Sequence, residues 1–68
     1  MNDENLRTSL RHLIDAYVEA DDAKQALLAL LERDEVPVKG ILADITPHLG
    51  RTSPADTDLL QEIVYFYL

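Results

Sequence analysis

Residues 4–35 contain neither glycine nor proline, the two residues that most often interrupt a helix. In the first half of this stretch, residues 4–20, apolar side chains recur every three or four positions, which places them along one side of a helix. Asp3, Glu4 and Asn5 suit the start of that helix, because short acceptor side chains cap free N–H groups and negative charge favours the positive end of the helix dipole. The sequence therefore predicts an amphipathic helix whose apolar side carries Leu6, Leu10, Leu13, Ile14, Tyr17 and Val18.

The second half of the stretch, DDAKQALLALLERDE, has equally high helix propensity, so the question is whether a new helix begins there. The spacing of Asp22 and Gln25 resembles a capping box, which indicates a break. A heptad repeat that runs through both halves, with Lys24 as its only polar exception, indicates continuity. We favour one long helix over residues 4–34, bent near Asp21 and Asp22 and too long for the chain to cover by itself. A break would instead give a compact bundle of four helices.

A proline ends this region and a second proline shapes the next. Pro37 disfavours the helical conformation at the residue before it and has a backbone angle suited to a new helix. Apolar residues at helical spacing then predict a short helix over 38–49. Pro47 should kink this helix or convert its last residues into a separate turn. Gly50 suits a left-handed residue that ends the helix.

The last helix has the clearest start signal in the chain. Ser53 is suited to cap it, Pro54 to occupy its first position and Asp56 to lie in its first turn. The sequence therefore predicts a helix over 54–67, with a core side formed by Leu59 or Leu60 together with Ile63, Val64 and Tyr67. The segment IVYFYL at its end also has high strand propensity, but its connection to a well-capped helix start favours helix.

The small size of the chain limits its stability. At 68 residues it is one domain, residues 1–68, and one core of this size supplies only about 3–5 kcal/mol. The chain has no cysteine, and its two histidines, His12 and His48, are too few for a recognisable zinc site. Oligomerisation or a partner protein therefore remains as the reinforcement. From the predicted helices we expect an all-α protein of three helices that forms a homodimer. No cofactor or metal is expected.

The charge of the chain narrows the class of partner. Thirteen acidic residues against six basic ones give a formal net charge of −7, which repels nucleic acid and anionic lipid. The start of the chain lacks a basic segment followed by an apolar run, and no apolar stretch reaches the roughly 18 residues that a membrane span needs. We expect a cytoplasmic protein of a bacterium or phage that binds neither nucleic acid nor membrane.

The polar residues show no pattern typical of an active site. Serine, histidine and carboxylate residues are present, but no nucleophile motif surrounds Ser53, which is better explained as a helix cap. Asp56, Asp58 and Glu62 lie close together in the last helix, where they complement the helix dipole and face solvent. The acidic runs lack the spacing of a calcium loop, and no glycine-rich phosphate loop is present. We therefore expect no enzymatic activity.

The end of the chain is the strongest indication of an interaction surface. Ile63 to Leu68 are six consecutive apolar or aromatic residues, and neighbours on a helix point about 100° apart, so they cannot all face one small core. Some of them either cover both sides of a layer between helices or contact a second chain, and we favour the second chain. The predicted interface residues are Leu10, Leu13, Tyr17, Leu60, Tyr65, Phe66, Tyr67 and Leu68.

A segment of about half the chain is similar to a known family. VPVKGILADITPHLGRTS, followed by LLQEIV, resembles the small enterobacterial connector proteins of two-component systems, the biofilm and acid-resistance regulators. The resemblance lies in Val36, Lys39, Ile41, Leu42, Leu49, Thr52, Ser53, Glu62, Ile63 and Val64. It implies an all-helical homodimer that regulates other proteins, such as sensor kinases, by binding them. Some members are linked to DNA, which the charge of −7 argues against here.

These observations together predict a small acidic regulator or adaptor that binds itself and an unidentified protein through an apolar helical surface. The alternative is a phage or plasmid inhibitor whose carboxylates imitate DNA phosphate, or an immunity or antitoxin protein that blocks a basic target. The two classes differ in salt dependence, because a mimic binds mainly through charge.

Overall fold

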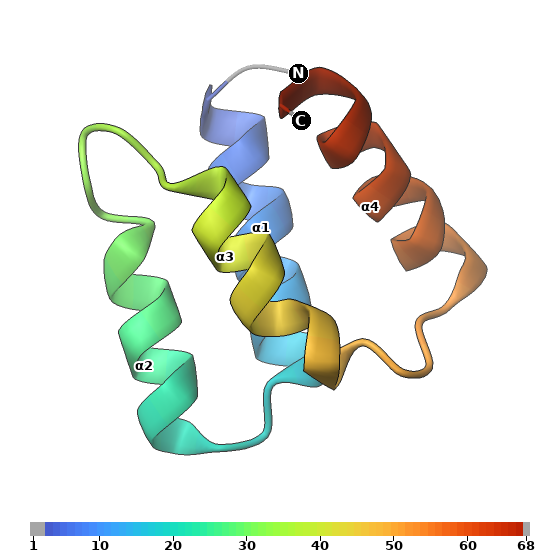
Figure 1. Cartoon of the computed structure of the whole chain (residues 1–68), viewed down its shortest axis with the longest axis horizontal. Coiled ribbons are helices and arrows are strands. Elements are labelled where there is room, and N and C mark those ends of the chain that lie inside the picture. Colours follow the sequence, from blue (N-terminus) through green and yellow to red (C-terminus); the bar gives the residue numbers. More distant parts are fainter. Residues whose placement is uncertain (1–2, 68) are drawn as a thin grey trace.

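The chain is an all-α bundle in a computed structural model that describes residues 3–67 (Figure 1). Its elements are α1 (Asp3–Tyr17), α2 (Asp21–Leu30), α3 (Val38–Ile45), the 3₁₀ turn η1 (Thr46–His48) and α4 (Pro54–Tyr67). In Figure 1, α3 lies in front of α1, while α2 and α4 lie to either side of this pair. The principal extents are 30 × 28 × 17 Å. The all-α prediction is confirmed, and no strand occurs between residues 3 and 67.

The predicted long helix over 4–34 is wrong, because the chain leaves the helical conformation at Val18–Ala20 and reverses direction. Ala20 is extended (φ −71°, ψ 121°), and α2 begins at the next residue. The predicted capping box is absent as well, since no side chain caps this helix and the N-terminal residues Asp21 and Asp22 contribute only negative charge. A straight helix over 4–34 would be about 46 Å long and would carry Leu27 and Leu31 beyond the rest of the chain. The reversal buries both side chains.

One apolar core joins all four helices. α1 supplies Leu6, Leu10, Leu13 and Ile14, and the residue after it, Val18, is also buried. Each large aliphatic side chain moved fully from water contributes about 1.5–3 kcal/mol, so α1 contributes more buried side chains to stability than any other helix. The other helices and the residues beside them complete the core with Leu27, Leu31, Ile41, Leu42, Ile45 and Ile63.

The connection from α2 to α3 is attached to α1 by arginine. Nη2 of Arg7 donates hydrogen bonds to the carbonyl oxygens of Arg33, at 2.9 Å, and Asp34, at 3.3 Å. One turn later, Arg11 forms an exposed ion pair with Glu32 at 3.3 Å. Arg33 and Asp34 lie beyond the end of α2, so Arg7 supplies donors to carbonyls of the connecting loop.

The second proline has the predicted effect, whereas the glycine after it does not. α3 ends at Ile45 and the chain tightens into η1, which contains Pro47, so the predicted separate turn is confirmed. The hydroxyl of Thr46 donates to the carbonyl of Leu42 at 2.5 Å across this junction. Gly50 does not adopt the predicted left-handed conformation, since no glycine among residues 3–67 has a positive φ. The 3₁₀ turn already ends the helix, so no left-handed residue is needed.

α4 begins as predicted but buries fewer residues than predicted. Its first residue is Pro54, and the backbone N–H of Asp56 donates to the hydroxyl of Ser53 at 3.2 Å, as expected of a cap. Ile63 is fully buried, and Leu59, Leu60 and Tyr67 are half-buried against the core. Val64, predicted to be core, is 46% exposed. α4 covers one edge of the bundle, so only one side of it has a neighbour (Figure 1).

Candidate functional site

The chain itself covers two of the predicted interface residues. Leu10 and Leu13 are both fully buried in the core. They were expected on a seam open to a second chain, because a long helix would have exposed them. The reversal at Val18–Ala20 brings α2 back against α1 and buries that seam. These two residues therefore belong to the folding of one chain.

Three other predicted residues are half-buried and have different roles. Tyr17 packs against the core and directs its hydroxyl to the start of α4. Leu60 forms part of a groove between α3 and α4. Tyr67 packs on the core and lines a hollow beside Val36 and Val38. The last predicted residue, Leu68, lies outside the described residues.

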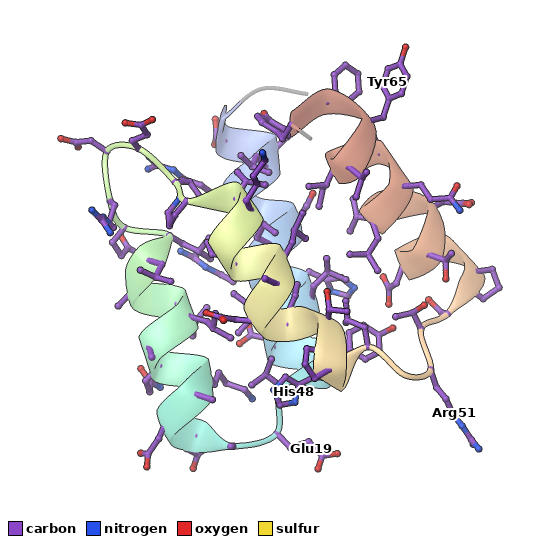
Figure 2. All side chains as sticks on the ribbon, in the orientation of Figure 1. Glu19, His48, Arg51 and Tyr65 are labelled. Atoms are coloured by element: carbon purple, nitrogen blue, oxygen red, sulfur yellow. The ribbon has the colours of Figure 1, made fainter. Side chains whose placement is uncertain are left out.

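The remaining two predicted residues form an exposed aromatic pair at the end of α4. Tyr65 is 83% exposed and Phe66 is 53% exposed. Their rings lie edge to face, with centroids 5.4 Å apart and planes at 89°. Tyr65 points away from the bundle (Figure 2). The aromatic pair therefore offers its area to solvent or to another molecule.

An apolar groove runs between α3 with η1 and α4, with a volume of about 710 Å³. We call it the α3–α4 groove, and its lining residues are Lys39, Leu42, Ala43, Thr46, Leu49, Leu60 and Val64. Of these, the sequence had predicted only Leu60 as an interface residue. Of the other apolar residues, Val64 was predicted to be core, and Leu42 and Leu49 were predicted only to follow the helical spacing of the segment 38–49. Spacing identifies the apolar side of a helix but does not show how far a neighbouring helix covers it.

A polar cluster joins α1 to the start of α4. Nε2 of His12 lies 2.8 Å from Oδ1 of Asp56, and the hydroxyl of Tyr17 donates to the other carboxylate oxygen. Tyr17 in turn accepts a hydrogen bond from the backbone N–H of Ser53 at 3.3 Å. An ionised carboxylate only accepts, so Nε2 of His12 carries the proton. Beside the cluster, the hydroxyls of Thr52 and Thr57 lie 2.6 Å apart. The cluster fixes where α4 begins against α1.

These contacts change the acidity of Asp56. The hydrogen bond from Tyr17 lowers the pKa of the Asp56 carboxyl, and the contact with His12 lowers that pKa further. Ser53 and the charge of His12 act in the same direction, while burial of the carboxyl opposes them. Donors directed at a carboxylate stabilise its ionised form. The role predicted for Asp56, a charge in the first turn of the helix, is thus only part of its function.

A histidine held by a carboxylate can act as a general base, so the cluster is also the best place to look for catalysis. Neither the α3–α4 groove nor the hollow beside Arg7 and Arg11 is lined by His12, Tyr17 or Asp56. The polar cluster thus holds α1 and α4 together, and neither of these two hollows adjoins it. Among the described residues, no group of three or more His, Cys, Asp or Glu could hold a metal ion.

None of the helices within residues 3–67 combines the length and the apolar character that crossing a bilayer requires.

Comparison with known proteins identifies no similar protein. No protein-family model, curated protein or solved structure matches the chain. The resemblance to the connector proteins of two-component systems therefore stays a prediction.

Proposed function

We propose that the protein is a small acidic regulator or adaptor of the cytoplasm that acts without catalysis by binding another protein. One observation carries the proposal. The large apolar side chains exposed among the described residues are consecutive, Val64, Tyr65 and Phe66, and all lie on α4. Single exposed apolar residues are normal on any protein, whereas a cluster with polar surroundings is typical of an interface. We therefore expect the partner to contact α4.

The charges of the molecule support a basic partner. α4 carries Asp56, Asp58 and Glu62 but no lysine, arginine or histidine, and the whole chain has a formal charge of −7. Complementary charge speeds encounter and selects the partner, while the apolar contact supplies most of the affinity. The protein would then act by covering a basic surface of its partner or by bridging two partners.

The predicted homodimer would have to use the same helix. With Leu10 and Leu13 buried, the exposed part of the predicted dimer interface lies on α4, and a second copy would bring another charge of −7. Like charges at an interface oppose association. We therefore place a basic partner ahead of a second copy, and the experiment below detects self-association as a separate outcome.

The test compares what wild-type protein and a double variant capture from a lysate of the native host. In the double variant Tyr65→Ser with Phe66→Ser, the exposed aromatic area is lost without a change in the core. The matched control, Ala16→Ser with Gln25→Ser, alters two exposed residues on α1 and α2. We expect a basic protein that wild type and control retain, that the double variant loses, and that binds again after purification. Equal capture by all three proteins would contradict the proposal.

Two further measurements separate the competing functions. A DNA mimic should lose its partner steeply between low and moderate salt, whereas an apolar contact should lose little. A homodimer should show a melting temperature that rises with protein concentration and a doubled mass by light scattering. If the double variant abolishes that dimer, a second copy is the partner and the basic partner is wrong.

A further inference from the structure

The α3–α4 groove is elongated and mainly aliphatic. Its lining residues on α3 and η1 extend from Lys39 to Leu49, which corresponds to about 15 Å along a helix axis. Leu42, Leu60 and Val64 give it aliphatic walls, and no aromatic residue or arginine within residues 3–67 lines it. Protein interfaces are typically rich in those two kinds of residue, whereas sites for small molecules are mostly apolar with few polar groups. A single aliphatic chain fits both the shape and the lining.

The groove also offers one positive charge. Among the described residues, the polar side chains that line it are those of Lys39 and Thr46. The hydroxyl of Thr46 already donates its hydrogen to the carbonyl of Leu42. Lys39 is exposed, and neither of the ion pairs formed within residues 3–67 includes it. An anionic group at this end of the groove would therefore find a cation to pair with.

The carboxylates of the neighbouring helices lie away from the groove. Asp58 and Glu62 are each two residues from Leu60, and two residues correspond to about 200° around a helix, so both lie on the opposite side of α4. The third carboxylate of α4 belongs to the polar cluster with α1. Asp44 of α3 lines a different hollow, beside α2. The groove is thus a locally positive, apolar site on an acidic protein, and physiological salt screens the distant negative charges.

We propose that the α3–α4 groove binds a fatty carboxylate, with its aliphatic chain between α3 and α4 and its carboxylate beside Lys39. An extended chain advances about 1.2 Å per bond, so a chain of about 12 carbons spans the groove. Burial of the methylene groups supplies the affinity, while Lys39 orients the ligand and selects the sign of its head group. This ligand site goes beyond the proposed function, which rests on the aromatic pair and on a protein partner.

The probe is dodecanoate, below the concentration at which it forms micelles and at physiological salt. Octanoate has the same head group on a shorter chain, and dodecyltrimethylammonium has the same chain with a positive head group. Titrations of isotope-labelled protein followed by NMR report where each compound binds. We expect dodecanoate to shift the amide signals of Leu42, Ala43, Leu49 and Val64. Octanoate should bind at least about tenfold more weakly, because it buries fewer methylene groups. Dodecyltrimethylammonium should bind at least about threefold more weakly, although the net charge of the protein is negative.

The two lysines of the chain provide a matched pair of variants. Lys39 lines the groove, whereas Lys24 lies on α2 and does not. Lys39→Gln should weaken dodecanoate binding about two- to fivefold, as expected for loss of an exposed ion pair, and should abolish the preference for carboxylate over trimethylammonium. Lys24→Gln makes the same change in net charge and should weaken binding less than about 1.5-fold.

Two alanines test the chain-binding part of the groove. Ala43 and Ala29 are both exposed alanines in helices, but only Ala43 lines the groove. Ala43→Glu should weaken dodecanoate binding about tenfold or more, because it places a carboxylate in the path of the aliphatic chain. Ala29→Glu should weaken it less than about twofold, since it changes only the overall charge. Circular dichroism checks that all four variants keep their helices.

Several results would overturn the site. These are equal binding of dodecanoate and dodecyltrimethylammonium, equal effects of Lys39→Gln and Lys24→Gln, and shifted signals spread over α1 and α2. If dodecanoate does not bind and Ala43→Glu converts a dimer into a monomer by light scattering, a second copy occupies the groove instead. If dodecanoate does not bind and Ala43→Glu loses the protein captured from the lysate, a protein segment occupies it. In each case the proposed function still depends on its own test, Tyr65→Ser with Phe66→Ser.

Discussion

At the scale of single residues, the contacts around Asp56 show what local sequence conveys and what it does not. Ser53, Pro54 and Asp56 were predicted as the start of a helix, and the structure confirms that start. Cap chemistry acts within three or four residues, so it can be read locally. The partners of the Asp56 carboxylate, His12 and Tyr17, are 44 and 39 residues distant in sequence. No local pattern identifies such pairs.

The lowered pKa of Asp56 leads to a pH-dependent prediction. A carboxyl whose pKa is lower in the folded state stabilises the fold above its usual pKa, and this contribution is lost as the pH falls through the lowered value. Asp56→Asn should therefore lower the melting temperature at neutral pH. The difference from wild type should shrink as the pH falls below about 4. Thermal melts followed by circular dichroism across this range measure it.

Asp58→Asn is the matched control, since it removes a carboxylate from the same helix at an exposed position. It should leave the melting temperature close to that of wild type at every pH. A gap between Asp56→Asn and wild type that stays constant down to acidic pH would show that the Asp56 carboxylate does not stabilise the fold through its charge.

At the scale of elements, the helices were predictable and one boundary was not. Periodic apolar residues identified all the helical segments, because that signal repeats over several turns. The heptad repeat, however, continued through the reversal at Val18–Ala20 and favoured the wrong alternative. The acidic residues Asp21 and Asp22 were the better signal, since negative charge is favourable at the start of a helix. The free energy that these two charges contribute is small compared with the free energy gained by burying Leu27 and Leu31.

The reversal can be tested with proline at Ala20. Its φ of −71° suits proline, and the residue precedes the helix. Ala20→Pro should therefore change the free energy of unfolding by less than about 1 kcal/mol. In a continuous helix the same substitution would cost about 3 kcal/mol, which is the loss expected for Ala26→Pro inside α2. Urea denaturation of both variants distinguishes the two folds, and equal losses would indicate the long helix.

Gly40 offers a stabilising change within α3. A methyl group added at this exposed position would meet no atom within 4 Å, and the backbone φ is not positive. Gly40→Ala should raise the free energy of unfolding by about 0.5–1 kcal/mol, because alanine favours helix over glycine. Gly50 has the same open surroundings but lies outside the helices, so Gly50→Ala should gain less. A loss of stability in Gly40→Ala, measured in urea, would show that α3 does not tolerate the methyl group.

At the scale of the whole molecule, α4 at the edge of the bundle depends on a single buried residue, as α2 does. Among its described residues only Ile63 is buried, whereas α1 buries several. This asymmetry explains why the predicted core role of Val64 is wrong and why the aromatic pair faces solvent. A helix at the edge of a small bundle has a neighbour on one side only, so the opposite side stays available for a partner.

Substitutions at two neighbouring positions of α4 should therefore differ strongly in effect. Ile63→Ala removes a fully buried side chain and should cost about 2–5 kcal/mol, comparable to the whole stability of a domain of this size. Val64→Ala, at a half-exposed position, should cost less than about 1 kcal/mol. Helicity measured by circular dichroism at increasing temperature compares them. Similar losses for both variants would mean that α4 packs more deeply than described.

The sequence by itself determined the helical class, the starts of α1, α3 and α4 and the acidic net charge, because periodicity, caps and charge are local or additive properties. Only the tertiary structure decided that the chain reverses after α1, that Leu10 and Leu13 are core rather than interface, and that α3 and α4 leave a groove. Each of these depends on which apolar surfaces the chain covers by itself. At residues 18–20, the free energy gained by burying Leu27 and Leu31 against distant parts of the chain outweighs the gain from continuing the helix. The local spacing of apolar residues contains no information about that balance.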